Sequence, residues 1–408
     1  MNRRKLAATL AGAALLGGCA AQQPSLDIES PYLDLNTVAR GQIVHLATGR
    51  LLTEGELYAY LAHFRVVYVG ESHDSIDDHL VQLNVLTAMQ QRFPGRVALG
   101  LEMLRRPAQA EVDAYLAGER TEKEFLKVWQ KNWGPRSFPY YRDILTLCRE
   151  QGIPVLALNS DRELEEAVRS AAAAPPSPEL AERLPQMDLD DPYYRATMEG
   201  FFAGHEGGSN QVEMFNRIQV LRDETMADTA AKFLRSPEGA DKRLVIFAGG
   251  NHVRYGYGIP RRLFRRVAAP YAVVDPLTVD FPEDKKDKLM DVTLPTLPLR
   301  PADIYWAVGY EDLDDRQVML GVGIEDAEGG GVRVKSVMPE SPAAGAGLQE
   351  GDIIVSVDGQ PVAEMFDLTY QVSLHKPGDV GPVEVQRGEE RLALEVTYDV
   401  VKHGGMPK

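Results

Sequence analysis

The stretch Arg65 to Asp74, R-V-V-Y-V-G-E-S-H-D, decides the fold of this chain. Residues 66–69 form an unbroken β-branched and aromatic run, which is typical of a strand covered on both faces of a parallel sheet. Gly70 allows a sharp turn after the run, so we expect Glu71 and His73 at the carboxyl end of the strand. Open α/β sheets place their ligands at this edge. The stretch therefore predicts an α/β domain with a site that begins at these two residues.

Three further apolar runs also end in polar residues. They are residues 96–101, ending in Glu102; residues 153–158, ending in Asn159, Ser160 and Asp161; and residues 244–248, followed by Gly249, Gly250, Asn251 and His252. Helical patterns at 78–92 and 122–130 separate the runs, as the crossovers between parallel strands require. If the strands are neighbours, their polar ends converge into a set suited to metal binding, acid-base chemistry or recognition of a polar ligand.

Each of these polar residues, taken alone, also has a structural explanation as a helix cap or a turn residue. The two histidines are harder to explain in this way, because His73 and His252 each follow a glycine at a strand end in two distant segments. This equivalence favours a functional role for the pair.

The N-terminus has the pattern of a secretory signal peptide, assigned to residues 1–18. Three basic residues at positions 3–5 precede the apolar run 6–16, which is too short for a transmembrane helix. The sequence L-G-G-C at 16–19 resembles a bacterial lipobox. The resemblance implies cleavage before Cys19 and a lipid anchor on it. Ala20 is compatible with outer-membrane sorting, so we expect a lipid-anchored protein of the bacterial envelope, on the outer membrane facing the periplasm.

Charge and cysteine content exclude two classes. Removal of the basic signal residues takes the formal charge from −16 to −19, and the sequence contains no basic tract, which argues against nucleic-acid binding. Lipidation of Cys19 would leave Cys148 as the second of two cysteines, so the mature chain is expected to have no internal disulfide. Cys148 falls in a helical pattern and is predicted to be a buried apolar thiol.

The 408 residues, 44% hydrophobic and 25% charged, suffice for two or three globular domains. Residues 19–40 are interpreted as a tether and 41–282 as a mostly parallel α/β domain with flanking helices and a helical insertion. Residues 283–302, with several prolines and a charge run, indicate a linker. Short strand-like runs broken by glycines then predict a small β-rich module at 303–402.

The motifs G-E-S-H at 70–73, Glu102 and G-N-H at 250–252 resemble the ChaN-like haem-binding lipoprotein family over about residues 40–280. The wider superfamily includes Tiki-type proteases and erythromycin esterases. The resemblance implies an α/β fold, a role in haem or iron acquisition, and haem held in part through a tyrosine.

Whether the chain is an enzyme stays open, because the superfamily also uses the matching positions for hydrolysis. In that alternative, a metal-dependent hydrolase, Glu71, His73, Glu102 and His252 would be catalytic. His73, Glu102 and His252 would hold a divalent ion such as zinc or manganese.

For haem, we expect His73, Asn251 and His252 to border the group and Tyr193 or Tyr194 to supply the ligand. A phenolate is a hard anionic donor that suits Fe(III). The sequence has no C-x-x-C-H motif, so any haem would be bound noncovalently. The paired tyrosines could equally begin a helix and pack on the sheet, and this alternative stays open.

The C-terminal module resembles a bacterial PDZ domain in the glycine-rich segments 320–324, 341–348, 351–354 and 357–359. Such domains add an extended peptide as a strand and receive its C-terminal carboxylate on backbone amides. The resemblance implies a peptide or protein partner and assigns the carboxylate cradle to Leu320, Gly321, Val322 and Gly323. A module that only packs on the first domain, and a homodimer of the whole chain, are left open.

Overall fold

The computed structural model describes residues 33, 35–134, 136–170, 175–202, 209–288, 297–313 and 318–400. The signal peptide, the lipobox with Cys19 and most of the tether lie outside the described residues. Within the described part, no helix combines the length and the apolar character needed to cross a membrane.

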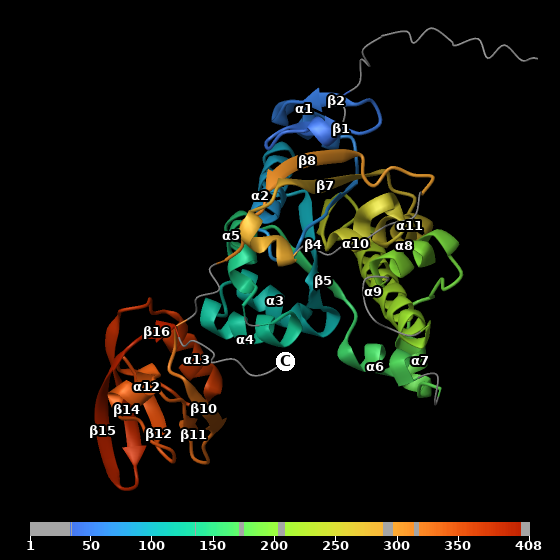
Figure 1. The fold of residues 1–408 in the computed structure, drawn as a ribbon. Coiled ribbons are helices and arrows are strands. Elements are labelled where there is room, and N and C mark those ends of the chain that lie inside the picture. Colours follow the sequence, from blue (N-terminus) through green and yellow to red (C-terminus); the bar gives the residue numbers. More distant parts are fainter. Residues whose placement is uncertain are drawn as a thin grey trace, which may run out of the picture.

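An eight-stranded sheet forms the centre of the first domain, in the order β2-β1-β8-β7-β3-β6-β4-β5 (Figure 1). Its strands are β1 (Ile43–His45), β2 (Arg50–Leu52), β3 (Val66–Val69), β4 (Val97–Arg105), β5 (Val155–Asn159), β6 (Arg243–Phe247), β7 (Tyr271–Asp280) and β8 (Ile304–Gly309). All pairings from β8 to β5 are parallel, whereas β1 pairs antiparallel with β2 and β8. The predicted mostly parallel α/β fold is confirmed.

Helices cover both faces of this sheet. They are α1 (Glu54–Leu61), α2 (Ile76–Arg92), α3 (Gln109–Leu116), α4 (Glu122–Asn132), α5 (Phe138–Gln151), α6 (Arg162–Ser170), α7 (Pro178–Arg183), α8 (Pro192–Phe202), α9 (Ser209–Arg235), α10 (Gly250–Val253) and α11 (Ile259–Arg266). Short 3-10 turns lie at η1 (Leu35–Thr37), η2 (Arg106–Ala108), η3 (Arg254–Gly256) and η4 (Glu283–Lys288).

The two-sided cover explains why β3 has no polar residue. Val67 and Val69 belong to a core cluster with α2, α4 and α5, whereas Val66 and Tyr68 belong to a second cluster with α9 and α11. Successive side chains of a strand point to opposite faces, so a strand buried on both faces must be apolar throughout. Cys148 on α5 is buried and unpaired, as expected.

The order of the sheet places the carboxyl ends of β3, β6 and β4 side by side. β3 lies between β7 and β6, and β6 lies between β3 and β4. The residues that follow β3 and β6 therefore meet Glu102 at one edge. Glu102 lies inside β4 rather than after it, because the apolar run continues through the buried Met103 and Leu104 to the strand end at Arg105.

The C-terminal domain is a small antiparallel sheet in the order β10-β11-β12-β14-β15, with β13 paired to β12 and a separate β9-β16 pair. Its elements are β9 (Val318–Met319), β10 (Val322–Asp326), β11 (Val332–Val337), α12 (Pro342–Ala346), β12 (Ile353–Val357), β13 (Gln360–Pro361), α13 (Met365–Ser373), β14 (Val380–Arg387), β15 (Glu390–Thr397) and β16 (Asp399–Val400).

The predicted domain boundary at residue 303 is wrong. β8 pairs with β7 and β1, so it belongs to the first sheet and buries Ile304, Trp306 and Val308 in its core. The expected linker 283–302 contains η4 and returns the chain to the same sheet. The prolines of this segment led to the linker prediction. Proline indicates an irregular connection, whether or not a domain ends there.

Candidate functional site

The four site residues predicted from the strand ends meet around Gly249. A Cβ atom built on Gly249 would lie 2.9 Å from both Cε1 and Nε2 of His73 and 3.6 Å from Oε2 of Glu102. The Gly249 amide donates to Oε2 of Glu102 at 2.8 Å, and Nε2 of His252 lies 3.2 Å from Oε1 of the same carboxylate. Glu71 is hydrogen-bonded to His73. A side chain at position 249 would collide with the His73 ring, so the glycine is required by close approach.

Glu71 is a buried carboxylate with several partners. Its Oε1 accepts from the Tyr141 hydroxyl and lies 2.6 Å from Nδ1 of His73, and its Oε2 accepts from Nε2 of Gln82 at 2.6 Å. Nε2 of His79 lies 3.6 Å from Oε2. Burial acts to raise the pKa of Glu71, but His79, His73 and the tyrosine hydroxyl outweigh it and lower the pKa. Glu71 is therefore ionised at neutral pH.

His73 is the accessible member of the set. Its side chain is 44% exposed, and its ring packs edge-on against Trp133 with centroids 4.8 Å apart. Desolvation acts to lower the pKa of His73, but the hydrogen bond to Glu71 and the charges of Glu71 and Glu102 raise it. The raised pKa favours the protonated ring, whose Nε2 faces Gly249.

His252, in contrast, is buried between two carboxylates. Its Nε2 faces Glu102, and its Nδ1 lies 2.6 Å from Oδ1 of Asp223 on α9. Burial acts to lower the pKa of His252, but the two carboxylates raise it to about 10. Both ring nitrogens therefore donate, and the ring is a cation at neutral pH.

The alternative metal site on His73, Glu102 and His252 is not supported by this arrangement. A histidine ligand must be neutral and offer a ring nitrogen, whereas both nitrogens of His252 point at carboxylates. Within the part of the chain that the structure describes, no group of three or more His, Cys, Asp or Glu side chains is arranged to hold a metal ion.

The two tyrosines proposed as haem ligands have different environments. Tyr194 is 2% exposed, and its hydroxyl donates to Oδ2 of Asp223 at 2.6 Å. Tyr194 therefore holds the carboxylate that contacts His252 and does not line the cavity beside Tyr193. Burial raises the pKa of Tyr194 well above its usual value. Tyr193 is 46% exposed, and its ring stacks on Tyr257 with centroids 5.6 Å apart and an interplanar angle of 11°. The ligand prediction therefore fits Tyr193 and not Tyr194.

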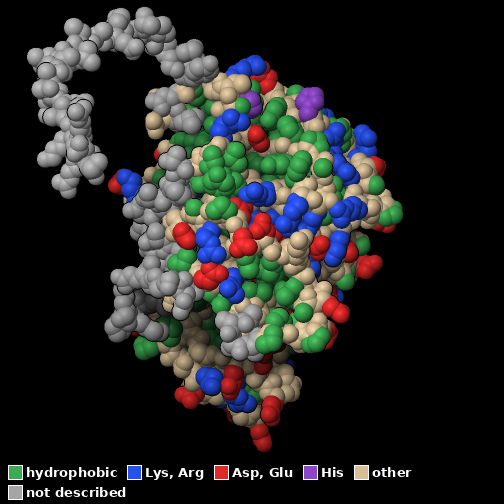
Figure 2. Space-filling view, turned by 90° about the vertical axis from the view of Figure 1, so that its right-hand side faces the viewer, with side chains coloured by type: hydrophobic (Ala, Val, Ile, Leu, Met, Phe, Trp, Pro, Cys, Tyr) green, Lys and Arg blue, Asp and Glu red, His purple; other side chains and the backbone are tan. Residues whose placement is uncertain are grey.

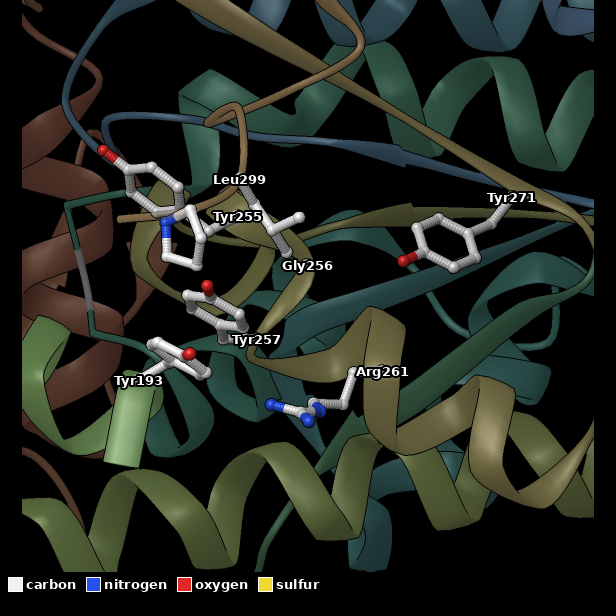
Figure 3. A pocket seen from close by; sticks show the side chains of 8 residues that line it. Tyr193, Tyr255, Gly256, Tyr257, Arg261, Tyr271 and Leu299 are labelled. Atoms are coloured by element: carbon white, nitrogen blue, oxygen red, sulfur yellow. The ribbon is translucent and has the colours of Figure 1, made fainter. Parts of the chain in front are cut away.

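A cavity of about 360 Å³ lies beside Tyr193 (Figure 3). Its walls come from α8, η3, α11, β7 and the segment before β8, and consist of Tyr193, Tyr255, Gly256, Tyr257, Arg261, Tyr271, Pro298 and Leu299. Tyr255 and Tyr257 are also close to parallel, with centroids 6.1 Å apart and an angle of 18°. Figure 3 shows these rings gathered near Tyr193, with Arg261 directed toward them and Tyr271 standing apart.

Tyr255, Tyr257 and Arg261 are wall residues that were not predicted from the sequence. The usable signal was the Y-G-Y sequence at 255–257, three residues after His252. Tyr255 has a φ of 58°, in the left-handed region that a bulky residue rarely adopts. This conformation is a local backbone irregularity at the cavity wall.

The remaining predicted residues have structural roles or await a test. At the end of β5, Ser160 donates to Glu165 and Asp161 accepts from the Leu164 amide, so these residues organise the start of α6. Asn251 is half-buried on α10. The polar residues after β5 thus follow the helix-cap interpretation rather than the functional one.

In the C-terminal domain, the predicted carboxylate cradle 320–323 leads into β10, which is an edge strand. The Leu320 and Gly321 carbonyls accept from the amides of Ala343 and Met338, and Gly321 has a φ of 74°. These bonds fix the loop from one side, while the edge of β10 opposite β11 lies in the position that an added peptide strand would take.

Comparison with known proteins identifies both domains. The model of the family described as "Haem-binding uptake, Tiki superfamily, ChaN" matches residues 57–263, and a PDZ domain model matches residues 318–398. The chain belongs to this ChaN family. Its C-terminal domain is a PDZ domain, as the glycine pattern predicts.

Among solved structures, a structure described as cofacial heme binding to ChaN of Campylobacter jejuni is similar, with a TM-score of 0.50 and 16% identity. The match covers 65% of this chain and 95% of that chain, and at this identity it supports the fold alone.

Among curated proteins, the serine endoprotease DegS of Escherichia coli (strain K12) is 38% identical over 93 residues, which is 22% of this chain and 26% of DegS. RETICULATA-RELATED 5, a chloroplastic protein of Arabidopsis thaliana, is 23% identical over 228 residues, which is 51% of this chain and 30% of that protein. The ChaN-family chain therefore spans less than a third of the length of these curated relatives.

Proposed function

We propose that this ChaN-family protein binds haem noncovalently in the tyrosine-lined cavity and takes part in haem or iron uptake at the bacterial envelope, while its PDZ domain engages a protein partner. The observation that carries the proposal is the cavity itself, where three tyrosine rings lie close to parallel beside an arginine.

The cavity suits a flat aromatic ligand. The stacked rings of Tyr193, Tyr255 and Tyr257 line one part of the wall, and Pro298 and Leu299 add apolar wall. The volume of about 360 Å³ falls in the range of small-molecule pockets. The hydroxyl of Tyr257 is buried without a hydrogen-bond partner among the described residues, which leaves a polar atom at the wall for a ligand to satisfy.

The charges around the cavity favour an anionic ligand. Arg261 lies over the Tyr257 ring at 5.7 Å and pairs with Asp191, which orients its guanidinium beside the cavity. The face that carries α8, α9 and α11 shows Lys and Arg side chains interspersed with Asp and Glu and with hydrophobic side chains (Figure 2). A guanidinium in this position would neutralise a propionate.

Haem would supply an Fe(III) centre that accepts a hard anionic ligand. Tyr193 is the tyrosine among the predicted pair whose side chain is exposed at the cavity, and we assign the ligand role to it. Tyr194 would hold α8 in place through its hydrogen bond to Asp223, which contacts His252. Of two adjacent residues of α8, Tyr193 would then bind the iron and Tyr194 would fix the helix.

Placement at the membrane rests on the lipobox pattern ending at Cys19, with a lipid anchor and an envelope location as the proposal. The PDZ domain would then hold a protein partner near the membrane through strand addition on β10. Radiolabelled palmitate incorporation in wild type and in a Cys19→Ala variant tests the anchor. Size-exclusion chromatography with and without haemin tests for a homodimer.

A haemin titration tests the haem proposal. Purified full-length protein should give a new Soret band that saturates with haemin. Tyr193→Phe should weaken binding at least about tenfold, as loss of a ligand bond implies, and Tyr60→Phe, on the remote helix α1, should not. Absence of a Soret band in the wild type would remove the proposal.

A further inference from the structure

We propose that helix α4 connects the peptide groove of the PDZ domain to the His73 site, so that occupancy of the groove changes haem binding. The His73 site reaches the tyrosine cavity through Glu102, His252 and Asp223, which accepts from Tyr194, the neighbour of Tyr193 on α8. The inference concerns regulation of the proposed haem-binding function, and part of its test is independent of haem. It rests on what contacts the two ends of α4 (Figure 1).

The first half of α4 holds the PDZ domain. Nζ of Lys123 lies 2.8 Å from Oδ1 of Asp367, and Lys127 pairs with Glu364. The same two ammonium groups lie 5.5 Å and 5.1 Å from the ring centroids of Tyr370 and Phe366. Lys123 and Lys127 are four residues apart and therefore share one face of α4. This face binds α13 through charge and cation-π contacts together.

The helix α13 also forms one wall of the peptide groove. It packs against β9, β10 and β12, and the Met365 amide donates to Asp326 at the end of β10. Leu368 and Val372 point into the domain core. A peptide that adds to the open edge of β10 must therefore fit against α13. The residues of α13 that contact α4 lie on another side of the same helix, so α13 stands between the groove and the first domain.

The second half of α4 contacts the loops of the candidate site. Trp133, which caps the helix, packs edge-on against His73. Oδ1 of Asn132 accepts from the Arg105 amide at the end of β4, and the Lys131 carbonyl accepts from Arg162 after β5. The end of one helix thus contacts the residues that follow β3 and β5 and the last residue of β4.

The length of α4 makes it a short, direct connection. Ten residues separate Lys123 from Trp133, which corresponds to about 15 Å along a helix. Under the proposal, a displacement of α13 reaches Trp133 through this helix. Coupling between two ligand sites is reciprocal, so haem must also change the peptide affinity by the same factor.

The peptide experiment uses the full chain. Peptides with free C-termini are selected from a phage-displayed library against it, and the strongest binder is synthesised with a free and with an amidated C-terminus. We expect the free acid at saturation to change the haemin dissociation constant at least about fivefold, the lower end of typical coupling, and the amidated peptide to have no effect. Haemin and peptide that both bind without changing each other's affinity would overturn the proposal.

A charge exchange tests the helix contact. Lys127→Glu should reduce the peptide effect to less than about twofold, Glu364→Lys should do the same, and the double variant should restore it. Lys232→Glu, an equal charge change on the exposed surface of α9, should leave the effect intact. Equal coupling in all four variants would show that α4 does not carry it.

A readout without haem separates this proposal from the haem proposal. The His73 ring resonances in NMR should move when the peptide binds, and also in Lys127→Glu without peptide, because Trp133 shifts against the ring. If haemin fails to bind but these resonances move, haem binding is refuted and the connection stands. If the resonances stay fixed in Lys127→Glu, the connection is refuted, whether or not a peptide binder is found.

Discussion

The substitution His252→Ala should cost about 3–5 kcal/mol of unfolding free energy at pH 6.5. The imidazolium lies between the buried carboxylates of Glu102 and Asp223. Its removal takes the cation away from both and leaves them only neutral donors, the Gly249 amide and the Tyr194 hydroxyl. A pKa raised from 6.5 to about 10 corresponds to an upper value of about 5 kcal/mol at about 1.4 kcal/mol for each pKa unit.

The sign of the pH dependence follows from the raised pKa. The folded protein binds the His252 proton more tightly than the unfolded chain, so the stabilisation is complete below about pH 6.5 and is lost as the pH rises toward 10. The difference between wild type and His252→Ala should therefore shrink between pH 6.5 and pH 9.5.

Urea denaturation followed by tryptophan fluorescence measures this difference. The three tryptophans, Trp129, Trp133 and Trp306, all lie in the first domain, so the signal reports that domain alone. A difference below about 1 kcal/mol at pH 6.5, or one that stays constant to pH 9.5, would refute the account of His252 as a buried cation.

Two further predictions use the same assay. Gly70→Ala would place a Cβ atom 2.6 Å from Oδ1 of Asp275 and should destabilise the first domain by about 1–3 kcal/mol; Gly55→Ala, whose Cβ meets nothing within 4 Å, should not destabilise it. Tyr141→Phe removes the hydroxyl that donates to buried Glu71 and should cost about 1–3 kcal/mol, and an unchanged midpoint would show that the bond is not formed.

The position of Glu71 and His73 could be predicted from residues 65–74 alone, because it depends only on the strand that precedes them. A strand covered on both faces must be apolar, and the residues after it must lie at the edge of the sheet, so the run 66–69 was sufficient to place Glu71 and His73. The meeting with Glu102 and His252 followed from parallel topology alone, since neighbouring parallel strands end at one edge.

The partners that decide the chemistry could not be predicted in this way. Asp223 lies in the middle of the 27-residue helix α9, where no motif marks it, yet it fixes the charge of His252. The tyrosine cavity combines segments more than 60 residues apart in sequence, from Tyr193 to Tyr257. Only the packing of α8 against α9 and α11 decides that Tyr193 faces this cavity and Tyr194 faces Asp223.

The central claim is that the parallel tyrosines hold haem, and one absorption experiment tests it most directly. Full-length protein and the triple variant Tyr193→Phe/Tyr255→Phe/Tyr257→Phe are titrated with haemin side by side, after circular dichroism has shown that both are folded. The account predicts a saturable Soret band for the wild type and binding at least about a hundredfold weaker for the variant. Equal Soret titrations for the two proteins, or no band in the wild type, would contradict it.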